Sequence, residues 1–506
     1  MVTPKVLIAT IGWCLLACFA SSVHAQSGMR QPNILIVIAD DQSYPHASAY
    51  GSKMVTTPGF DYVAKHGALF TKAYVTSPGC SPSRASLLTG LYPWQIEEAG
   101  SHASSFSTKY LCFPDILRQA GYHIGYTGKG WGPGNWEISG RKYNPAGPEY
   151  NTKTLSAPSS SISKTDYTAN FKQFLSERKP GQPFYFWVGT QEPHRPYENK
   201  SWVKGGLSLS QAEVPGFLPP AEAIKSDLLD YATEIAWSDS HLMNCINELK
   251  RIDEFDNTII IALADNGMSF PYAKANCTDA GIHVPLAICW GNKIKQQQVI
   301  DALVSTIDIA PTILAATSLK SDKPLNGQDL FLLLNAGAKK YTSDAVYAGR
   351  ERHSFSRYEN MGYPMRSIRW KDYLLIRNFH PERWPAGDPK VITGENKQED
   401  AFYDIDDGPS KQYLMDHRDE VSVTPYFNLA MGSKRPEFEL YDLSKDAACM
   451  HNLANNATYA DVFKTLKQKL QDKLVATRDT RIGNDPEVWE TYPRLEGKMR
   501  NFQKNN

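Results

Sequence analysis

The chain has 506 residues, 42% of them hydrophobic and 21% charged, which is typical of a globular protein and excludes a disordered or fibrous one. Its 54 Lys and Arg residues are balanced by 54 Asp and Glu residues, so no basic surplus predicts a nucleic acid or anionic membrane partner. At this length one core usually stops growing, so we expect a large domain and a smaller one.

The first 25 residues resemble a cleaved signal peptide. They contain one Lys, an apolar run over 6–20 and small residues before the end at Ala25. We therefore expect an exported protein, periplasmic or secreted. The alternative is an outer-membrane lipoprotein anchored through Cys18, because Leu-Leu-Ala-Cys18 approximates an acylation motif. No later apolar run reaches the ~20 residues of a transmembrane segment.

Short runs rich in Ile, Val and aromatic residues alternate with segments of helical periodicity between residues 26 and 340. This alternation predicts an α/β catalytic domain with a large, mostly parallel sheet sandwiched by helices. The expected strands are Asn33–Ala39, His123–Thr127, Phe184–Gly189, Thr258–Ala264 and Val284–Trp290.

Helix boundaries in the same region follow from Pro and Gly positions. Pro58 and Pro114 each mark a helix start, and Pro82 is expected as a first helical residue with Gly90 closing that helix. Apolar positions over 228–249 repeat with the spacing of an amphipathic helix.

Beyond residue 340 the pattern changes. Short strands are expected at Tyr373–Arg377 and Phe438–Leu443, followed by a helix with apolar positions over 459–474. We therefore predict a smaller α+β subdomain over 341–506 that closes the substrate pocket.

Polar residues gather where the predicted strands end. Asp40 and Asp41 follow the first strand, Lys129 the second, and Asp265-Asn266 the fourth. Ligands in α/β sheets bind beyond the carboxyl ends of the strands, and oxygen ligands favour Ca²⁺ or Mg²⁺ over zinc. Each motif alone also fits a turn. The coincidence of several strand ends favours a shared metal site.

Six cysteines follow the predicted signal peptide, and Cys80 stands out among them. It lies in Ser77-Pro-Gly-Cys-Ser-Pro-Ser-Arg84, directly before an expected helix start where backbone N–H groups favour an anion. Arg84, one turn on, supplies a planar donor for an oxyanion. One cysteine pair could form a disulfide, but the spacing does not say which.

The motif Cys-x-Pro-x-Arg, followed by an apolar helix and Thr-Gly90, resembles the signature of type I sulfatases in the alkaline-phosphatase-like superfamily. This resemblance implies that a formylglycine-generating maturation enzyme converts Cys80 to formylglycine (3-oxoalanine). It also implies that Asp40, Asp41, Asp265 and Asn266 bind a metal, normally Ca²⁺ with Mg²⁺ as the alternative, completed by modified Cys80. The implied contacts to the sulfate and the formylglycine hydroxyls come from Arg84, Lys129, His194 and Lys274.

Within that family the chain is most similar to the heparan N-sulfatase (sulfamidase) branch and its bacterial relatives. Pro-His194-Arg195 and Tyr363-Pro-Met-Arg-Ser-Ile-Arg369 carry this similarity. One departure is Trp131, which stands where the family usually has a histidine two residues after the lysine of its Gly-Lys motif. Residues that could contact the sugar are His102, Arg195, Arg352, His353 and Arg366.

The resemblance implies an exo-acting carbohydrate sulfatase. A hydroxyl of the formylglycine hydrate attacks sulfur, and His194 protonates the leaving oxygen or nitrogen. Two alternatives are a phosphodiesterase or phosphonate monoester hydrolase of the same superfamily, and a non-catalytic glycan-binding relative. The sequence does not identify the sugar, which could be heparan or an algal polysaccharide such as ulvan or carrageenan. It also does not distinguish an O-sulfate from an N-sulfate.

Overall fold

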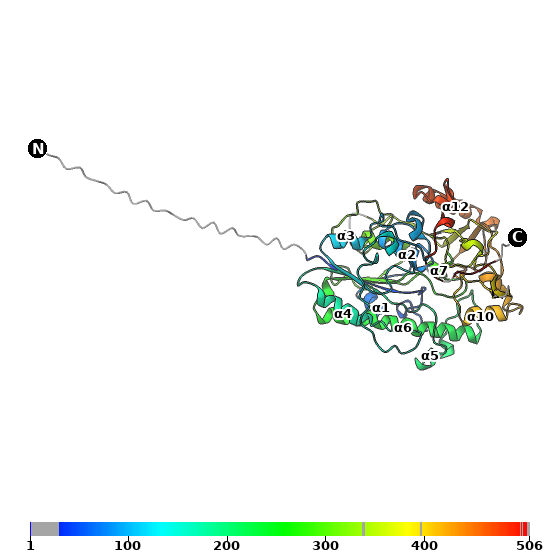
Figure 1. Cartoon of the computed structure of the whole chain (residues 1–506), viewed down its shortest axis with the longest axis horizontal. Helices are drawn as coiled ribbons and strands as arrows, with labels where there is room; N and C mark the ends of the chain where they lie inside the picture. Colours follow the sequence, from blue (N-terminus) through cyan, green and yellow to red (C-terminus); the bar gives the residue numbers. More distant parts are fainter. Residues whose placement is uncertain (2–29, 336–339, 395–396, 496, 498, 503–506) are drawn as a thin grey trace. The chain divides into compact units, whose positions relative to one another are not determined.

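A seven-stranded sheet forms the centre of the computed structural model (Figure 1). The structure describes residues 1, 30–335, 340–394, 397–495, 497 and 499–502. Everything described below belongs to one compact unit, Pro32–Asn506. The predicted signal peptide and Cys18 lie outside the described residues. In the part described, no helix is both long and apolar enough to cross a bilayer.

The sheet is mostly parallel, as predicted. Its first four strands in spatial order run in the same direction: β4 (His123–Gly128), β5 (Phe184–Gly189), β1 (Asn33–Ala39) and β6 (Thr258–Ala264). The sheet continues with β7 (Leu286–Cys289) antiparallel to β6, β2 (Gly67–Phe70) antiparallel to β7, and β8 (Gln298–Ile300) parallel to β2. The sequence analysis did not predict β2 or β8, because short strands carry little periodicity.

Helices cover both faces of this sheet, which explains why the strands β1, β5, β6 and β7 are buried along their whole length. Ile34, Ile36 and Ile38 pack on the side of α2 and α3, while Leu35 and Val37 pack on the side of α1, α4 and α6. The helices are α1 (Pro58–Lys65), α2 (Cys80–Thr89), α3 (Phe113–Gln119), α4 (Tyr167–Glu177), α5 (Ser201–Lys204), α6 (Glu222–Arg251), α7 (Asp279–Ile282), α8 (Ile309–Ala316) and α9 (Phe331–Leu334).

One predicted helix boundary is wrong. Helix α2 begins at Cys80, so Pro82 is its third residue rather than its first. A proline is tolerated throughout the first turn, because those backbone nitrogens have no partner within the helix. Gly90 ends the helix as predicted, in the left-handed conformation with φ 67°.

The C-terminal part contains a second, antiparallel sheet in the order β10-β11-β12-β15. Its apolar face packs on α12 through Leu466, Leu470 and Leu474, in a core that also includes Tyr92 and Trp94. The two parts thus share a core, and the boundary at residue 340 stays a prediction. The elements are β10 (Ala345–Arg350), β11 (Met365–Trp370), β12 (Tyr373–Asn378), β13 (Lys390–Thr393), β14 (Lys397–Asp400), α10 (Pro409–Asp416), α11 (Thr424–Phe427), β15 (Phe438–Asp442), α12 (Ala460–Ala476) and α13 (Val488–Thr491).

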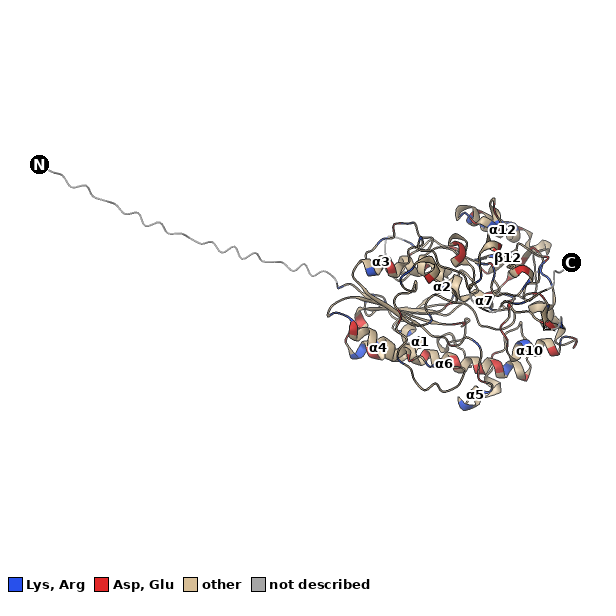
Figure 2. Ribbon diagram, in the orientation of Figure 1, with Lys and Arg blue, Asp and Glu red and all other residues tan. Residues whose placement is uncertain are grey.

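Basic and acidic side chains are mixed on the outer helices, as the balanced charge predicts. Helices α4 and α10 each carry basic and acidic residues (Figure 2).

Two short strands, β3 (Ala73–Tyr74) and β9 (Val304–Ser305), pair with each other separately from the large sheet.

Candidate active site

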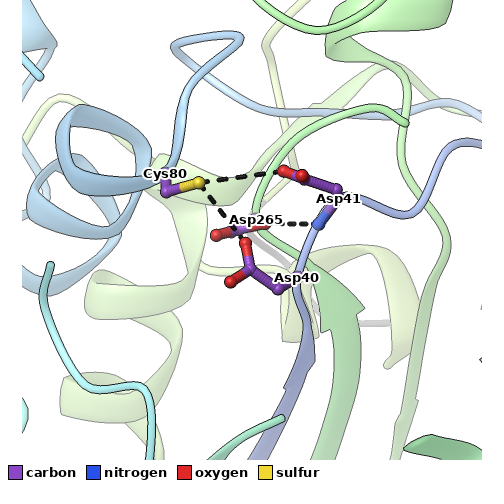
Figure 3. Close-up of side chains that lie close together, drawn as sticks. All are labelled: Asp40, Asp41, Cys80 and Asp265. Carbon is purple, nitrogen blue, oxygen red and sulfur yellow. Dashed lines mark hydrogen bonds between the residues drawn. The ribbon is translucent and has the colours of Figure 1, made fainter. Parts of the chain in front are cut away.

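Three carboxylates meet beyond the ends of the neighbouring strands β1 and β6 (Figure 3). Asp40 and Asp41 follow β1, and Asp265 follows β6. Asp41 adopts a left-handed backbone conformation with φ 70°, and its N–H donates to Asp265 Oδ1 at 3.1 Å. The parallel pairing of the two strands therefore places three acidic side chains at one buried point, as their positions in the sequence indicate.

Cys80 reaches the same point from the first residue of α2. Its Sγ donates to Asp40 Oδ1 at 3.3 Å and lies 3.7 Å from Asp41 Oδ1, and the side chain is 1% exposed. Burial raises the pKa of the Cys80 thiol, and Asp40 raises it further. An unmodified Cys80 is thus a protonated thiol and a poor nucleophile.

The donor set fits a divalent cation. Potential ligand atoms of Asp40, Asp41, Cys80 and Asp265 lie within 4.8 Å of one another. Asn266 Nδ2 donates to Asp41 Oδ1 at 2.7 Å. The other amide atom of Asn266, Oδ1, is buried and has no hydrogen-bond partner among the described residues. A buried amide oxygen without a partner is costly, and a cation with oxygen ligands would satisfy it.

The burial of these carboxylates also favours a bound cation. Burial raises the pKa of Asp265 to about 6 despite Arg84, and Asp40 adds to the rise. The pKa of Asp40 is held well below its usual range because Lys129 and Arg84 outweigh the effect of burial. A bound cation would favour the ionised form of Asp265 and offset the cost of burying its charge.

Three cationic side chains surround the carboxylates. Arg84 Nε donates to Asp265 Oδ2 at 2.7 Å, Lys129 Nζ to Asp40 Oδ2 at 2.5 Å, and Lys274 Nζ to Asp41 Oδ2 at 2.7 Å. One terminal nitrogen of Arg84 is buried and makes no hydrogen bond. The three bases balance the three acids, so a divalent cation would leave the site positive and suited to an anion.

His194 lies on the loop after β5, at the edge of this cluster. Its Nδ1 lies 2.6 Å from the carbonyl oxygen of Arg195, so Nδ1 carries the proton that donates to it. Nε2 then faces the cluster, 3.8 Å from Asp41 Oδ2. This orientation leaves Nε2 able to exchange a proton with a bound ligand.

A cavity of about 460 Å³ opens above the cluster and contains Lys129, His194 and Lys274 in its wall. Two of the five residues predicted to contact sugar, His102 and His353, also line it. The other three do not. The guanidinium of Arg195 pairs with Asp227, that of Arg366 with Asp479 and Glu351, and that of Arg352 donates to the carbonyl oxygen of Tyr492. These contacts thus account for three side chains that do not line the cavity.

Trp131 has a packing role where a histidine was expected. Its Nε1 donates to the carbonyl oxygen of Ser81 at 3.0 Å, and its ring stacks edge to face on Phe106. The side chain is buried and supports the first turn of α2 from the side. Gly132 and Pro133 line the cavity instead.

The sequence analysis missed several cavity residues from the C-terminal part. Asp406 accepts from Lys274 at 3.1 Å, and Tyr403, Arg494 and Arg500 also line the wall. The one usable signal was the acidic sequence Asp404-Ile-Asp406-Asp407, which occurs outside any strand or helix.

Asp404 anchors the acidic segment 404–407 through buried contacts. It forms an ion pair with Arg357 at 2.7 Å and accepts hydrogen bonds from Arg350 and from the backbone N–H of Ser354, the latter at 3.0 Å. It thereby ties the segment bearing His353 to the segment bearing Asp406. Despite burial, Arg357 and Arg350 hold the pKa of Asp404 well below its usual range.

We expect Asp404→Asn to destabilise the fold by about 3–5 kcal/mol, because it leaves two buried arginines without their carboxylate. Urea unfolding measures this difference. Since the folded pKa is lowered, the stabilisation is fully present above the unfolded pKa of about 3.9 and is lost as pH falls below it. The difference between wild type and variant should therefore shrink in acid. The exposed Asp407→Asn is the control, and equal stability of both variants would contradict the prediction.

The sequence matches two protein-family models and several known proteins. The sulfatase family model matches residues 32–319, more than half of the chain, and the N-sulphoglucosamine sulphohydrolase C-terminal model matches 271–390. Human N-sulphoglucosamine sulphohydrolase is 26% identical, covering 89% of this chain and 91% of that protein. An ulvan-active sulfatase of Formosa agariphila is 28% identical, covering 87% of this chain and 78% of that protein.

Solved structures share the fold at lower identity. One, described in complex with its substrate D-glucosamine-2-N,6-O-disulfate, has a TM-score of 0.63 at 19% identity and covers 90% of this chain and 99% of its own. A phosphonate monoester hydrolase of Agrobacterium radiobacter has a TM-score of 0.60 at 18% identity, covering 89% of this chain and 97% of its own. At such identities the likeness concerns the fold alone.

Proposed function

Because the chain belongs to the sulfatase family, we propose that this sulfuric ester hydrolase removes sulfate from the end of a sulfated carbohydrate chain at the strand-end cluster. The observation that carries the proposal is the buried meeting of Cys80 with Asp40, Asp41 and Asp265 under a cavity lined with cations. The human and Formosa agariphila relatives, named for sulfated carbohydrates, support this substrate class.

Two groups would complete the site. Cys80, after conversion by a formylglycine-generating enzyme, would supply the nucleophilic hydroxyl, and Ca²⁺, or Mg²⁺, held by Asp40, Asp41, Asp265 and Asn266 would neutralise negative charge on the sulfate. The unpartnered Oδ1 of Asn266 is the structural reason to include it among the ligands.

The cationic side chains would bind the sulfate oxygens. The terminal nitrogen of Arg84 that makes no hydrogen bond, together with Lys129 and Lys274, supplies donors inside a buried site where electrostatic interactions are strong. These groups are fixed by Asp265, Asp40 and Asp41 before any ligand binds. Little reorganisation is then required as charge develops on the oxygens.

His194 would protonate the leaving group. Its Nδ1 is committed to the backbone, so only Nε2 can donate a proton toward the cavity. The leaving atom would be oxygen for a sulfate ester or nitrogen for an N-sulfate. A cavity of about 460 Å³ suits one or two sugar units, in keeping with attack at a chain end.

We expect His194→Ala to lower kcat by about 10²–10⁴-fold on a carbohydrate sulfate, because an alkoxide or amide leaving group requires a proton. On an aryl sulfate, whose phenolate leaves unprotonated, the loss should be much smaller. Steady-state assays on both substrates measure this. His123→Ala, on β4 and outside the cavity wall, is the control. Equal losses on both substrates would exclude proton donation by His194.

A desulfation screen over defined heparan and algal oligosaccharides tests the proposal and identifies the sugar. The wild-type protein should release inorganic sulfate from at least one of them. Paired assays with an aryl phosphate diester test the phosphodiesterase alternative, since the cluster could also bind a phosphoryl group. Faster turnover of the diester would favour that alternative and contradict the proposed function.

Export to the periplasm or medium is part of the proposal and rests on residues 1–25 alone. Mass spectrometry of the N-terminus of the mature protein would find Gln26 first. A lipid-modified Cys18 would instead establish the lipoprotein alternative.

A further inference from the structure

A second hollow, a surface groove of about 470 Å³, lies between α12 and the C-terminal sheet. Helix α12 covers the outer side of that sheet (Figure 1). None of the described residues that line the groove also lines the active-site cavity. All of them except Arg377 lie within 438–474, whereas the matched family models end at residue 390. The groove is therefore separate from the strand-end cluster, and the family match does not account for it.

The walls of this groove are basic. Arg377 comes from β12, and Lys464 and Lys467 come from α12, where a spacing of three residues places both lysines on one face of the helix. None of the described lining residues is acidic. Both lysines are exposed, and neither forms an ion pair with another described residue. Two positive charges are thus available to a ligand in the groove.

Acidic residues beside the groove offset only part of its charge. Glu437 pairs with Arg377 at 3.1 Å, and Asp472 accepts a hydrogen bond from Gln468 at 2.7 Å. Helix α12 contains four lysines and two aspartates, while the chain as a whole has equal numbers of basic and acidic residues. The positive surplus at the groove is therefore a local feature.

Two aromatic rings give the groove an apolar surface between its cations. The ring centres of Phe438 and Phe463 are 5.4 Å apart and the rings meet edge to face. Lys467 Nζ lies 4.7 Å from the ring centre of Phe438, and the guanidinium of Arg377 lies 5.6 Å from it. Such contacts hold cations beside the rings. Apolar surface next to cations matches a sulfated saccharide, whose C–H faces are apolar and whose sulfates are anionic.

We propose that this groove binds a stretch of a sulfated polysaccharide chain, with sulfate groups at Lys464 and Lys467 and a sugar ring on the two phenylalanines. The inference rests on the proposed function, in which the strand-end cluster acts on the end of such a chain. A second site that holds internal stretches would keep the enzyme on the polymer and raise the effective concentration of chain ends. The groove is about as large as the active-site cavity of about 460 Å³, so a similar length of chain fits in it.

Binding to two sulfated polymers, heparin and ulvan, tests this proposal. Long chains offer many internal stretches for each chain end, so their binding reports on a site away from the active site. The measurement uses protein with Cys80→Ala, which prevents sulfate removal during the titration. For the double variant Lys464→Gln, Lys467→Gln we expect about fivefold to tenfold weaker binding of at least one polymer, because two exposed charge contacts are lost. Added salt should narrow the difference.

Kinetics give a second measurement on any polymer from which the wild type releases sulfate. In the same double variant with Cys80 intact, KM on the polymer should rise about fivefold at unchanged kcat. KM on a disaccharide unit of that polymer should stay the same, because a disaccharide cannot occupy the groove and the active site together.

The matched control is the double variant Lys142→Gln, Lys179→Gln. It removes two exposed lysines outside the groove and so lowers the net charge by the same amount. Its affinity for both polymers should stay within about twofold of the parent protein, since exposed charges far from a contact are screened. Melting temperatures of both double variants verify that they fold. Chemically desulfated heparin should bind the parent protein more weakly than heparin does.

Three results would overturn the proposal: no binding of either polymer, unchanged affinity in the groove variant, or an equal loss in the control variant. Equal affinity for heparin and its desulfated form would exclude recognition of sulfate. The binding measurement needs no turnover, so failure of the proposed function is seen separately, as no sulfate release by the wild type across the desulfation screen.

Discussion

Cys80→Ala is expected to abolish sulfate release, with a loss of kcat/KM of about 10⁴-fold or more, as for other enzymes that lose their nucleophile. Cys80 sits at the start of α2 between Asp40 and Asp41, where no other described side chain could replace it as a precursor of the nucleophile. Its thiol is protonated by virtue of burial, so residual activity from an unmodified thiol is also unexpected.

The measurement pairs sulfate release with mass spectrometry of the peptide that contains Cys80. Active protein should show an aldehyde in place of the thiol. Cys245→Ala removes another buried free thiol, within α6, and serves as the matched control with near-normal activity. Full activity from protein whose Cys80 is wholly an unmodified thiol would exclude the formylglycine mechanism. Equal, zero release from wild type and variant across a broad panel would instead support a non-catalytic, glycan-binding protein.

Asp41→Asn is expected to weaken divalent cation binding at least 100-fold and to lower kcat/KM by about 10³-fold, because it removes one of three ligand charges while keeping the side-chain shape. Asn266→Ala should have a smaller effect of the same kind, since it removes a neutral oxygen. Chelation of the wild-type protein should reproduce the loss, and adding back Ca²⁺ or Mg²⁺ separately should identify the effective ion.

Metal content per chain, measured by mass spectrometry of the purified proteins, checks this independently of activity. Asp301→Asn is the control: its side chain is 69% exposed and contacts Lys72 and Thr71 at the surface. A wild-type protein that keeps full activity after exhaustive chelation and contains no divalent cation would rule out the proposed metal.

The strand-end residues could be predicted because parallel neighbours in a sheet end at the same edge. Once the runs ending at Ala39 and Ala264 are assigned as adjacent parallel strands, Asp40 and Asp265 must lie close together. The helix that follows Gly79 was also predictable, because Pro and Gly signals are local, although its start was placed two residues too late. Sequence spacing was therefore enough to predict the strand-end cluster.

The cavity wall above the cluster could not be predicted in the same way. Asp406, Arg494 and Arg500 come from irregular segments whose positions depend on distant hydrogen bonds, such as that between Leu495 and Ala103. Arg366 was misplaced for a related reason, because its buried carboxylate partner Asp479 lies 113 residues away in the sequence. Composition and periodicity contain no information on such long-range pairs.

The burial of Cys80 also limits the time during synthesis in which this cysteine is accessible to another enzyme. The groups that enclose it include Asp265 and Lys274, which follow it by roughly 185 residues or more. At synthesis rates of about 5–20 residues per second, the ribosome needs about 10–40 s to produce them, and during that interval the cysteine motif is still an open peptide. The maturation enzyme that we propose would have to act before the motif is enclosed, so protein that folds faster than it is modified would remain inactive for as long as it stays folded.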